Sequence, residues 1–469
     1  MIKNMYLFLP EIYLIFLVIV LFFQTLSKKN LSTQWLSYAL FIGLGVCFYS
    51  LPAKGLLFFN TYKIDRLSQF FKLLTYLGLT ICVLNAKKNP QLTASVKKSD
   101  YYLFMCLSSL GILFLSSSIE IFTIYIALEL TSYSLYILVP LRSNSPKAVE
   151  AAIKYMLYGA VATALGLYGV SYILAVHHTT FLTTLATQNW NFTASTLSII
   201  GLGLFLLSFL YKLSLFPFHF WSPDLYEGTS NETATFAAVM PKIGAVIVLI
   251  RLVSFVPCVE LKTILAIFAA CSMTYGNILA LVQKDVKRLL GYSTISHAGY
   301  MVMGLVVGTT QGLGSVAFYV FAYVLMNLAI FWVITHLGQD GNNVSIEDLQ
   351  GLYQRAPIFA FVLAVAAFGL AGIPPTIGFT GKFFLLTSLW GHGFNWLVII
   401  AALNTGIAIF YYLNLVRFAY TKEPTEQELA TDFNSNLVAF SLSVGILVIG
   451  LLPQNIVQFL INSVSQLKP

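Results

Sequence analysis

Charged side chains are scarce in this sequence. Asp, Glu, Lys and Arg account for 9% of its 469 residues, whereas hydrophobic residues account for 58%. An ordinary soluble domain carries roughly 25% charged residues, so the composition excludes a soluble globular protein. The mean hydropathy of +0.82 agrees with that exclusion. The chain is therefore predicted to be an all-α polytopic membrane protein.

Acidic residues are scarcer than basic ones, but this imbalance does not indicate nucleic acid. Lys and Arg number 26 against 18 for Asp and Glu, a formal net charge of +8. The basic residues gather in short loops between apolar runs, where such residues orient a membrane chain. No nucleic-acid partner is expected.

The usual cofactor motifs are missing as well. No two cysteines have the Cys-x-x-Cys spacing that could hold zinc or an iron–sulfur cluster. Neither a Gly-x-Gly-x-x-Gly motif after a strand nor a Walker A pattern is present, so no nicotinamide or ATP site is expected in this chain. The five cysteines are dispersed: Cys47, Cys82, Cys106, Cys258 and Cys271.

Long apolar stretches recur along the whole chain. Each has about 18 to 25 residues, the length that a helix needs to cross about 30 Å of hydrocarbon. We predict about 14 transmembrane helices. Their starts lie near Tyr6, Gln34, Asp65, Tyr101, Ile119, Val149, Ser195, Glu232, Glu260, Arg288, Gln311, Pro357, Asn395 and Asn436. The first is expected to be retained, because no cleavage site of small residues follows it.

Basic residues are concentrated in every second connection between these helices. The odd-numbered connections carry Lys28, Lys29, Lys87, Lys88, Lys97, Lys98, Arg142, Lys147, Lys284, Lys287, Arg288, Arg355, Arg417 and Lys422. The even-numbered connections carry only Lys54, Lys63, Arg66, Arg251 and Lys262. This asymmetry predicts that the odd connections face the cytoplasm or matrix and that both termini face the other side.

Two stretches combine helix breakers with a lysine in apolar surroundings. One is residues 211–221, around Lys212 and Pro217; the other is residues 372–382, which ends in Lys382. Paired broken helices in corresponding halves of a membrane chain are typical of inverted repeats. We therefore predict two inverted five-helix repeats within one membrane domain. The predicted segments are an N-terminal three-helix segment (1–100), a first repeat (101–256), a second, inverted repeat (257–420) and a C-terminal helix (421–469).

Five ionisable residues interrupt the predicted spans: Glu129, Lys154, Lys212, Lys242 and Lys382. A charge in the bilayer centre costs about 3 kcal/mol or more, so this set indicates an ion pathway, most simply for protons. A desolvated lysine can load and release a proton as neighbouring charges change. Glu129 is predicted to gate such a lysine, although hydroxyl groups nearby could instead keep it neutral.

Simpler interpretations stay open for several of these residues. Lys212 and Lys242 could extend to the membrane surface. Lys154 follows Glu150 by four residues, so the two could form an ion pair at the membrane edge. His297, among hydroxyl groups in an apolar helix, could belong to the relay or could simply be held by hydrogen bonds.

Three motifs resemble a known family. They are Lys212-Leu-Ser-Leu-Phe-Pro-Phe-His-Phe-Trp-Ser-Pro-Asp224, Lys287-Arg-Leu-Leu-Gly-Tyr-Ser-Thr-Ile-Ser-His297 and Gly372-Ile-Pro-Pro-Thr-Ile-Gly-Phe-Thr-Gly-Lys382. In this order they are similar to the signatures of subunit 2 of NADH:ubiquinone oxidoreductase (respiratory complex I), an antiporter-like subunit of the membrane arm. The resemblance covers nearly the whole chain.

The resemblance assigns a role to each ionisable residue. It makes Glu129 the fifth-helix glutamate, Lys154 the sixth-helix lysine, Lys212 the central seventh-helix lysine, Lys242 the bridging eighth-helix lysine, His297 the tenth-helix histidine and Lys382 the twelfth-helix lysine. Together they would form a proton relay that is driven by quinone reduction at a distance.

The resemblance also implies partners, cofactors and a location. The chain would be part of an enzyme without redox chemistry of its own, because NADH, FMN, iron–sulfur clusters and ubiquinone would bind other subunits. Its partners would be membrane lipids and other membrane-arm subunits, including the antiporter-like subunit 4. With 38 Phe and 26 Tyr, the composition favours an AT-rich organellar genome and hence the mitochondrial inner membrane over a bacterial plasma membrane or a thylakoid.

Two other functions remain compatible with the sequence. The same scaffold could serve as a subunit of a multi-subunit cation/proton antiporter. It could also be a structural subunit of the membrane arm, in which the charged residues serve helix packing and no proton passes.

Overall fold

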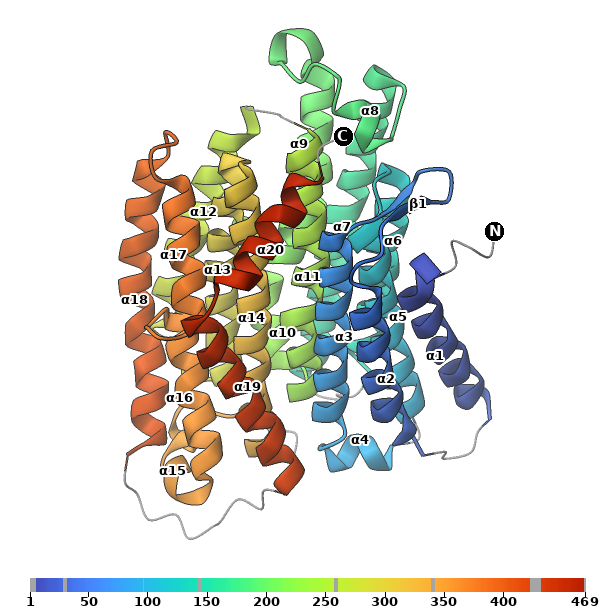
Figure 1. Ribbon diagram of the computed structural model, residues 1–469. Coiled ribbons are helices and arrows are strands. Elements are labelled where there is room, and N and C mark those ends of the chain that lie inside the picture. The colour runs from blue at the N-terminus through green and yellow to red at the C-terminus, as the bar shows by residue number, and fades with distance from the viewer. Residues whose placement is uncertain are drawn as a thin grey trace. The chain divides into compact units, whose positions relative to one another are not determined.

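The computed structural model describes residues 6–27, 32–95, 97–141, 146–256, 260–338, 342–421 and 432–467. This part of the chain is almost wholly helical and contains one short β-hairpin (Figure 1). Lys28, Lys29, Arg142, Lys422 and Cys258 lie outside the described residues.

The chain divides into two compact units. Residues 1–213, 240–263 and 462–469 form the first unit, and residues 214–239 and 264–461 form the second. Three helices contribute to both: α11 (Asn231–Phe255), α12 (Glu260–Ala280) and α20 (Gln454–Ser465). The predicted repeats at residues 101–256 and 257–420 stay a prediction.

The first unit holds the N-terminal half of the chain. Its remaining elements are α1 (Leu9–Leu26), α2 (Trp35–Ser50), β1 (Gly55–Leu57), β2 (Tyr62–Ile64), α3 (Arg66–Ala86), α4 (Pro90–Ala94), α5 (Lys98–Ser117), α6 (Ile121–Leu138), α7 (Pro146–His177), α8 (Leu182–Leu185) and α9 (Phe192–Leu213). The antiparallel strands β1 and β2 pair Gly55 with Ile64 and Leu57 with Tyr62.

The second unit is also a helical bundle. Its remaining elements are α10 (Trp221–Gly228), α13 (Val286–Val307), α14 (Thr310–Leu337), the 3-10 helix η2 (Glu347–Leu349), α15 (Leu352–Arg355), α16 (Pro357–Ala371), α17 (Ile377–Leu389), α18 (Asn395–Ala419) and α19 (Phe433–Leu451).

The predicted all-α polytopic fold is confirmed. In the described part of the chain, eleven helices are long and apolar enough to cross a membrane, and α2, α16 and α17 are shorter apolar helices. Helix α13 is a further helix of 22 residues. A helix begins within a few residues of every predicted span start. Beyond these spans, α20 forms after Pro453 and buries Val457, Leu460 and Val464 along one face; the hydropathy pattern did not predict this separate helix.

Helices α7 and α9 of the first unit pack closely because two glycines face each other. A Cβ atom on Gly169 would lie 2.3 Å from the carbonyl oxygen of Gly201, and a Cβ on Gly201 would lie 2.6 Å from the carbonyl oxygen of Gly169. Small residues let helix backbones approach in this way within membranes. The contact positions Lys212 at the end of α9 relative to α7.

Both predicted helix breaks are present. Helix α16 ends at Gly372, whose φ of +89° suits a residue without a Cβ, and its N–H donates to the Phe368 carbonyl at 2.9 Å. Helix α17 resumes at Ile377. Helix α9 ends at Leu213, and the next residue, Ser214, also has a positive φ of +65°. Each break therefore leaves carbonyl groups at a helix end inside an apolar stretch.

Candidate functional site

Lys212 is the central residue of a cluster in the first unit. Its side chain is 2% exposed, and its Nζ has no hydrogen-bond partner among the described residues. The ammonium instead lies 5.8 Å from the ring centroids of Tyr136 and Tyr155. Aromatic faces attract a cation, most strongly when water is excluded, so they replace part of the lost hydration. The prediction that Lys212 is buried is confirmed.

Glu129 supplies the opposite charge in this cluster. It lies near the middle of α6 and attracts the ammonium of Lys212 electrostatically. The phenol groups of Tyr125 and Tyr133, one turn away on either side, lie near its carboxylate, whose buried Oε1 has no hydrogen-bond partner among the described residues. The charge of Glu129 thus acts on Lys212, and the switchable pair of these two residues stays a prediction.

Lys242 and Lys154 complete the predicted set in this unit. Lys242 lies on α11 directly after Pro241, is 1% exposed and repels Lys212 electrostatically. Lys154 differs, because its side chain is 35% exposed and its Nζ lies 2.6 Å from the carboxylate of Glu150. The ion pair that the sequence left open as an alternative for Lys154 is therefore present.

The second unit holds the other two predicted residues, His297 and Lys382. His297 is buried on α13, with Nδ1 2.7 Å from the hydroxyl of Tyr319 and Nε2 3.2 Å from the hydroxyl of Tyr412. The charge of Lys382 acts on this ring. A phenol can donate or accept, so either tautomer of His297 fits between the two tyrosines. Such a group can pass a proton without moving.

Lys382 is held by the end of the broken helix. Its Nζ donates to the carbonyls of Leu370 and Ala371, at 3.1 and 3.0 Å, and lies 4.7 Å from the ring centroid of Tyr300. These carbonyls end α16, where the helix dipole favours a positive charge. The break in the sequence therefore creates the site for the lysine that follows it.

The tyrosines around His297 were not predicted from the sequence. Tyr412 also hydrogen-bonds to Ser293, and its neighbour Tyr411 donates to Asn277 at 3.0 Å. The sequence separations are 119 and 134 residues. Tyrosine is common in this chain, with 26 copies, so composition could not single out these residues.

A second set of buried charges in the first unit was also missed. Glu11 and Lys72 form an ion pair of 2.6 Å, with both side chains fully buried. Asp65 and Arg251 form another, of 2.9 Å. Both Glu11 and Lys72 interrupt apolar helices, so the rule that selected Glu129 could have found them. Arg251 was assigned to a loop; this is wrong, because it lies inside α11, is fully buried and pairs with Asp65.

Two basic residues assigned to odd connections are also engaged within the protein. Lys287 is buried and donates to the Thr229 carbonyl at 2.5 Å. Arg288 lies 3.1 Å from Asp224 and 2.6 Å from Glu227. Both belong to the first turn of α13 and not to a free loop. Lys287 and Arg288 therefore indicate the orientation of the chain less clearly than the exposed Lys97 and Lys284.

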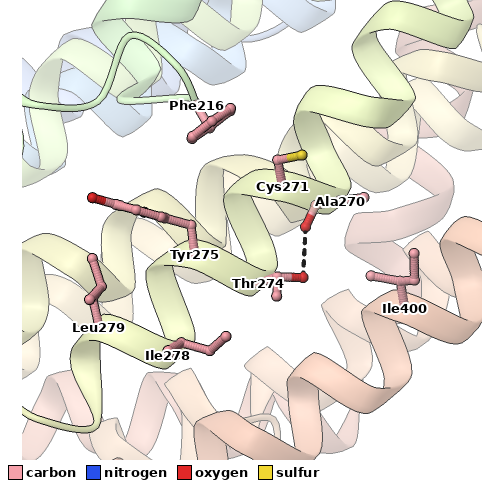
Figure 2. A pocket seen from close by; sticks show the side chains of 8 residues that line it. All are labelled: Phe216, Ala270, Cys271, Thr274, Tyr275, Ile278, Leu279 and Ile400. Carbon is pink, nitrogen blue, oxygen red and sulfur yellow. Dashed lines mark hydrogen bonds between the residues drawn. The ribbon is translucent and has the colours of Figure 1, made fainter.

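An apolar pocket of about 550 Å³ opens beside α12 in the second unit. Figure 2 shows its lining, in which the Thr274 hydroxyl donates to the Ala270 carbonyl at 2.9 Å. The lining residues are Phe216, Ala270, Cys271, Thr274, Tyr275, Ile278, Leu279 and Ile400. None is charged, and none belongs to the predicted relay. In the described ranges, no group of three His, Cys, Asp or Glu residues could hold a metal ion.

Buried lysines beside helix breaks, in a polytopic helical chain, define an ion-translocating class of membrane protein. Comparisons with known proteins agree. Residues 118–408, more than half of the chain, match the family model described as NADH:quinone oxidoreductase/Mrp antiporter, TM. The chain therefore belongs to the NADH:quinone oxidoreductase/Mrp antiporter family.

Curated relatives narrow the likeness to one kind of subunit. The chain is 48% identical over 463 residues to the NADH-quinone oxidoreductase subunit N 2 of Solidesulfovibrio magneticus, covering 98% of this chain and 99% of the relative. It is 40% identical to the subunit N 2 of Opitutus terrae, covering 98% and 97%. The predicted resemblance to an antiporter-like membrane-arm subunit of complex I is confirmed.

Solved structures show the same fold. A chain of respiratory complex I from Thermus thermophilus has a TM-score of 0.84 at 29% identity, covering 96% of this chain and 98% of that one. A chain of the Mrp complex from Dietzia has a TM-score of 0.88, but at 17% identity this likeness concerns the fold alone.

Proposed function

We propose that this chain is a proton-translocating membrane-arm subunit of an NADH:quinone oxidoreductase. The observation that carries the proposal is the buried ammonium of Lys212, which lies against two tyrosine rings and in the field of Glu129. A helix that needed only packing would be more stable with an apolar side chain at this position. The charge therefore serves transport.

The relay uses the residues that the resemblance assigns. Separation of Glu129 from its lysine partners changes how tightly Lys212 holds its proton, and the proton then passes by way of Lys242 and His297 towards Lys382. Lys154 takes part as the sixth-helix lysine that the resemblance assigns, in an ion pair with Glu150. Burial of Lys212, Lys242, His297 and Lys382 keeps the proton from returning through bulk water.

The redox chemistry of the complex lies on other subunits. NADH, FMN, iron–sulfur clusters and ubiquinone bind there, and this chain receives only the conformational and electrostatic signal. Its neighbours are other membrane-arm subunits, among them the antiporter-like subunit 4. Because the relatives named above are bacterial, we place the chain in a bacterial plasma membrane in preference to the mitochondrial inner membrane.

Substitution of Lys212 tests the function. In assembled complex reconstituted into liposomes, Lys212→Met is expected to lower NADH-driven proton pumping by at least about tenfold, because it removes an acid–base group. Lys212→Arg should fail as well, since arginine does not release its proton. Lys97→Met, at an exposed lysine, is the matched control. Normal pumping by assembled Lys212→Arg complex would exclude a protonation cycle at this residue.

The two alternative functions give different results in the same preparation. A cation/proton antiporter would co-purify without NADH oxidation activity and would move protons in response to a sodium gradient. A purely structural subunit would lose assembly, seen on native gels, before it lost pumping. We expect the Lys212→Met complex to assemble fully and to lose proton pumping. We also expect the purified complex to oxidise NADH.

A further inference from the structure

The buried charges at the start of α1 form a network within the first unit. Glu11 Oε1 lies 2.6 Å from the Nζ of Lys72 on α3 and accepts a hydrogen bond of 2.5 Å from the hydroxyl of Tyr62 on β2. The Lys72 ammonium also lies 5.3 Å from the Tyr62 ring centroid. All three side chains are buried.

Arg251 connects this network to α11. Its guanidinium pairs with Asp65, the N-cap of α3, and donates to the carbonyl of Ser116 at the end of α5, at 3.1 and 2.8 Å. The charge of Arg251 also acts on the phenol of Tyr62. Lys242 lies nine residues earlier on the same helix, roughly 13.5 Å along its axis. The network and a relay lysine therefore share one rigid helix.

Four buried polar atoms of this network have no hydrogen-bond partner among the described residues: Glu11 Oε2, Asp65 Oδ2, Lys72 Nζ and Arg251 Nη1. Lys72 Nζ and Asp65 Oδ2 lie in the two ion pairs, so Glu11 Oε2 and Arg251 Nη1 are the two that have no ion-pair contact either. A carboxylate has about four acceptor positions, of which Glu11 uses those on one oxygen only. The unused acceptor positions on the buried Glu11 carboxylate can accept a proton.

Helix packing alone does not explain these charges. Replacing a buried ion pair by apolar residues is often neutral or stabilising, so the pair is weak evidence for a role in stability. Tyr62 remains a donor, because burial and the Glu11 carboxylate raise the pKa of this phenol well above its ordinary value. The Tyr62 hydroxyl donates a hydrogen bond to Oε1 of Glu11, and Oε2 of Glu11 accepts none among the described residues.

The contacts bring these groups together at one end of the first unit, where α1 and α3 begin and α5 and α11 end. Glu11 is in the first turn of α1, Asp65 precedes α3, Ser116 is near the end of α5, and Arg251 is near the end of α11. Helix α5 packs against both α1 and α3. According to the predicted orientation, this end faces the side of the termini, opposite the basic loops.

We propose that Glu11 is a further proton-carrying residue of this chain and marks a proton site on the side of the termini. Glu11 Oε2 takes a proton from a hydrated proton, which leaves water and the neutral acid. Lys72 keeps its own proton throughout. Return of the proton from Oε2 to water on the side of the termini restores the ion pair. This step rests on the proposed function, since it needs a proton supply through the subunit.

Glu120 provides a matched control at the same end of the unit. It is also a buried carboxylate, but both of its oxygens cap α6, with Oε1 accepting from the Phe122 N–H at 3.0 Å and Oε2 from the Thr123 N–H at 2.7 Å. Its role is structural, so Glu120→Gln is expected to affect stability and leave the proton-to-electron ratio unchanged.

The first experiment compares Glu11→Gln, Glu120→Gln and Lys212→Met in assembled complex reconstituted into liposomes. We expect Glu11→Gln to lower the number of protons pumped per NADH to an extent comparable with Lys212→Met. Normal pumping by Glu11→Gln, with a loss in Lys212→Met, would overturn the inference about Glu11 alone. Normal pumping by both would overturn the proposed function as well.

The second experiment needs no substitution and covers the case in which Glu11→Gln does not assemble. Dicyclohexylcarbodiimide reacts with protonated carboxyl groups in apolar surroundings and not with a permanent carboxylate. During turnover of the intact complex, mass spectrometry should find the adduct on Glu11 and not on Glu120. An unmodified Glu11 beside a modified Glu129 would overturn the proposal.

Discussion

Gly372 makes room for Lys382. A Cβ atom on Gly372 would lie 3.0 Å from Cδ of Lys382 and 3.4 Å from its Nζ, and the φ of Gly372 is +89°. The same residue ends α16, whose last carbonyls bind the lysine ammonium. One glycine therefore allows both the helix break and the position of the charge.

Gly372→Ala should impair both stability and pumping. The left-handed backbone costs a residue with a Cβ about 1 kcal/mol, and the added methyl group pushes Lys382 away from the α16 carbonyls. We expect a lower midpoint of thermal unfolding and a lower proton-to-electron ratio. Gly406→Ala, where a Cβ would meet no atom within 4 Å, is the control. Equal behaviour of the two variants would show that Lys382 does not depend on this space.

Glu129 and Lys212 should act as a unit. Glu129→Gln removes the charge that acts on the Lys212 ammonium, and Lys212→Met removes the proton carrier itself. Each single variant should lower pumping, and the double variant should be little worse than the poorer single. Pumping in the four members of this cycle, at matched assembly, is the measurement. Defects that multiply independently would assign the two residues to separate steps.

The tyrosines beside His297 should matter for proton transfer and little for assembly. Tyr319→Phe and Tyr412→Phe each remove one hydrogen bond to the ring, worth about 1 kcal/mol, or roughly a fivefold change in rate if the bond is made in the transfer step. We expect slower pumping at an unchanged amount of assembled complex. Tyr49→Phe, at a residue that is 77% exposed, is the control. Unchanged pumping in both variants would remove these phenols from the path.

Cysteine labelling should reveal the orientation of the chain. The exposed residues Lys97 and Lys284 belong to odd connections, so Lys97→Cys and Lys284→Cys should react with an impermeant maleimide from the cytoplasmic side. Tyr6→Cys and Gln466→Cys, near the two termini, should react from the opposite side. Cys47, Cys82 and Cys106 are buried, which limits the background reaction. Labelling of the two ends from different sides would mean an odd number of spans.

The sequence alone determined the membrane class, the approximate starts of fourteen spans and the two helix breaks. These are local properties, because hydropathy depends on windows of about 20 residues and Gly or Pro acts on its own backbone. It also singled out Glu129, Lys212, Lys242, His297 and Lys382, since a polar group inside an apolar run is visible without knowledge of its neighbours. Lys212, Lys242, Lys382 and His297 are buried in the structure.

Only the tertiary structure decided the partners of these charges. Glu11 and Lys72 are 61 residues apart, and Asp65 and Arg251 are 186 apart, so no window along the sequence connects them. The mistake about Arg251 has the same origin. A cation near a predicted helix end is normally assigned to a loop, because burying it is costly unless a carboxylate compensates its charge. For Arg251 that carboxylate is the distant Asp65, which the local sequence does not reveal. Pairing across the bundle makes such burial possible, and this pairing exists only once the helices have packed.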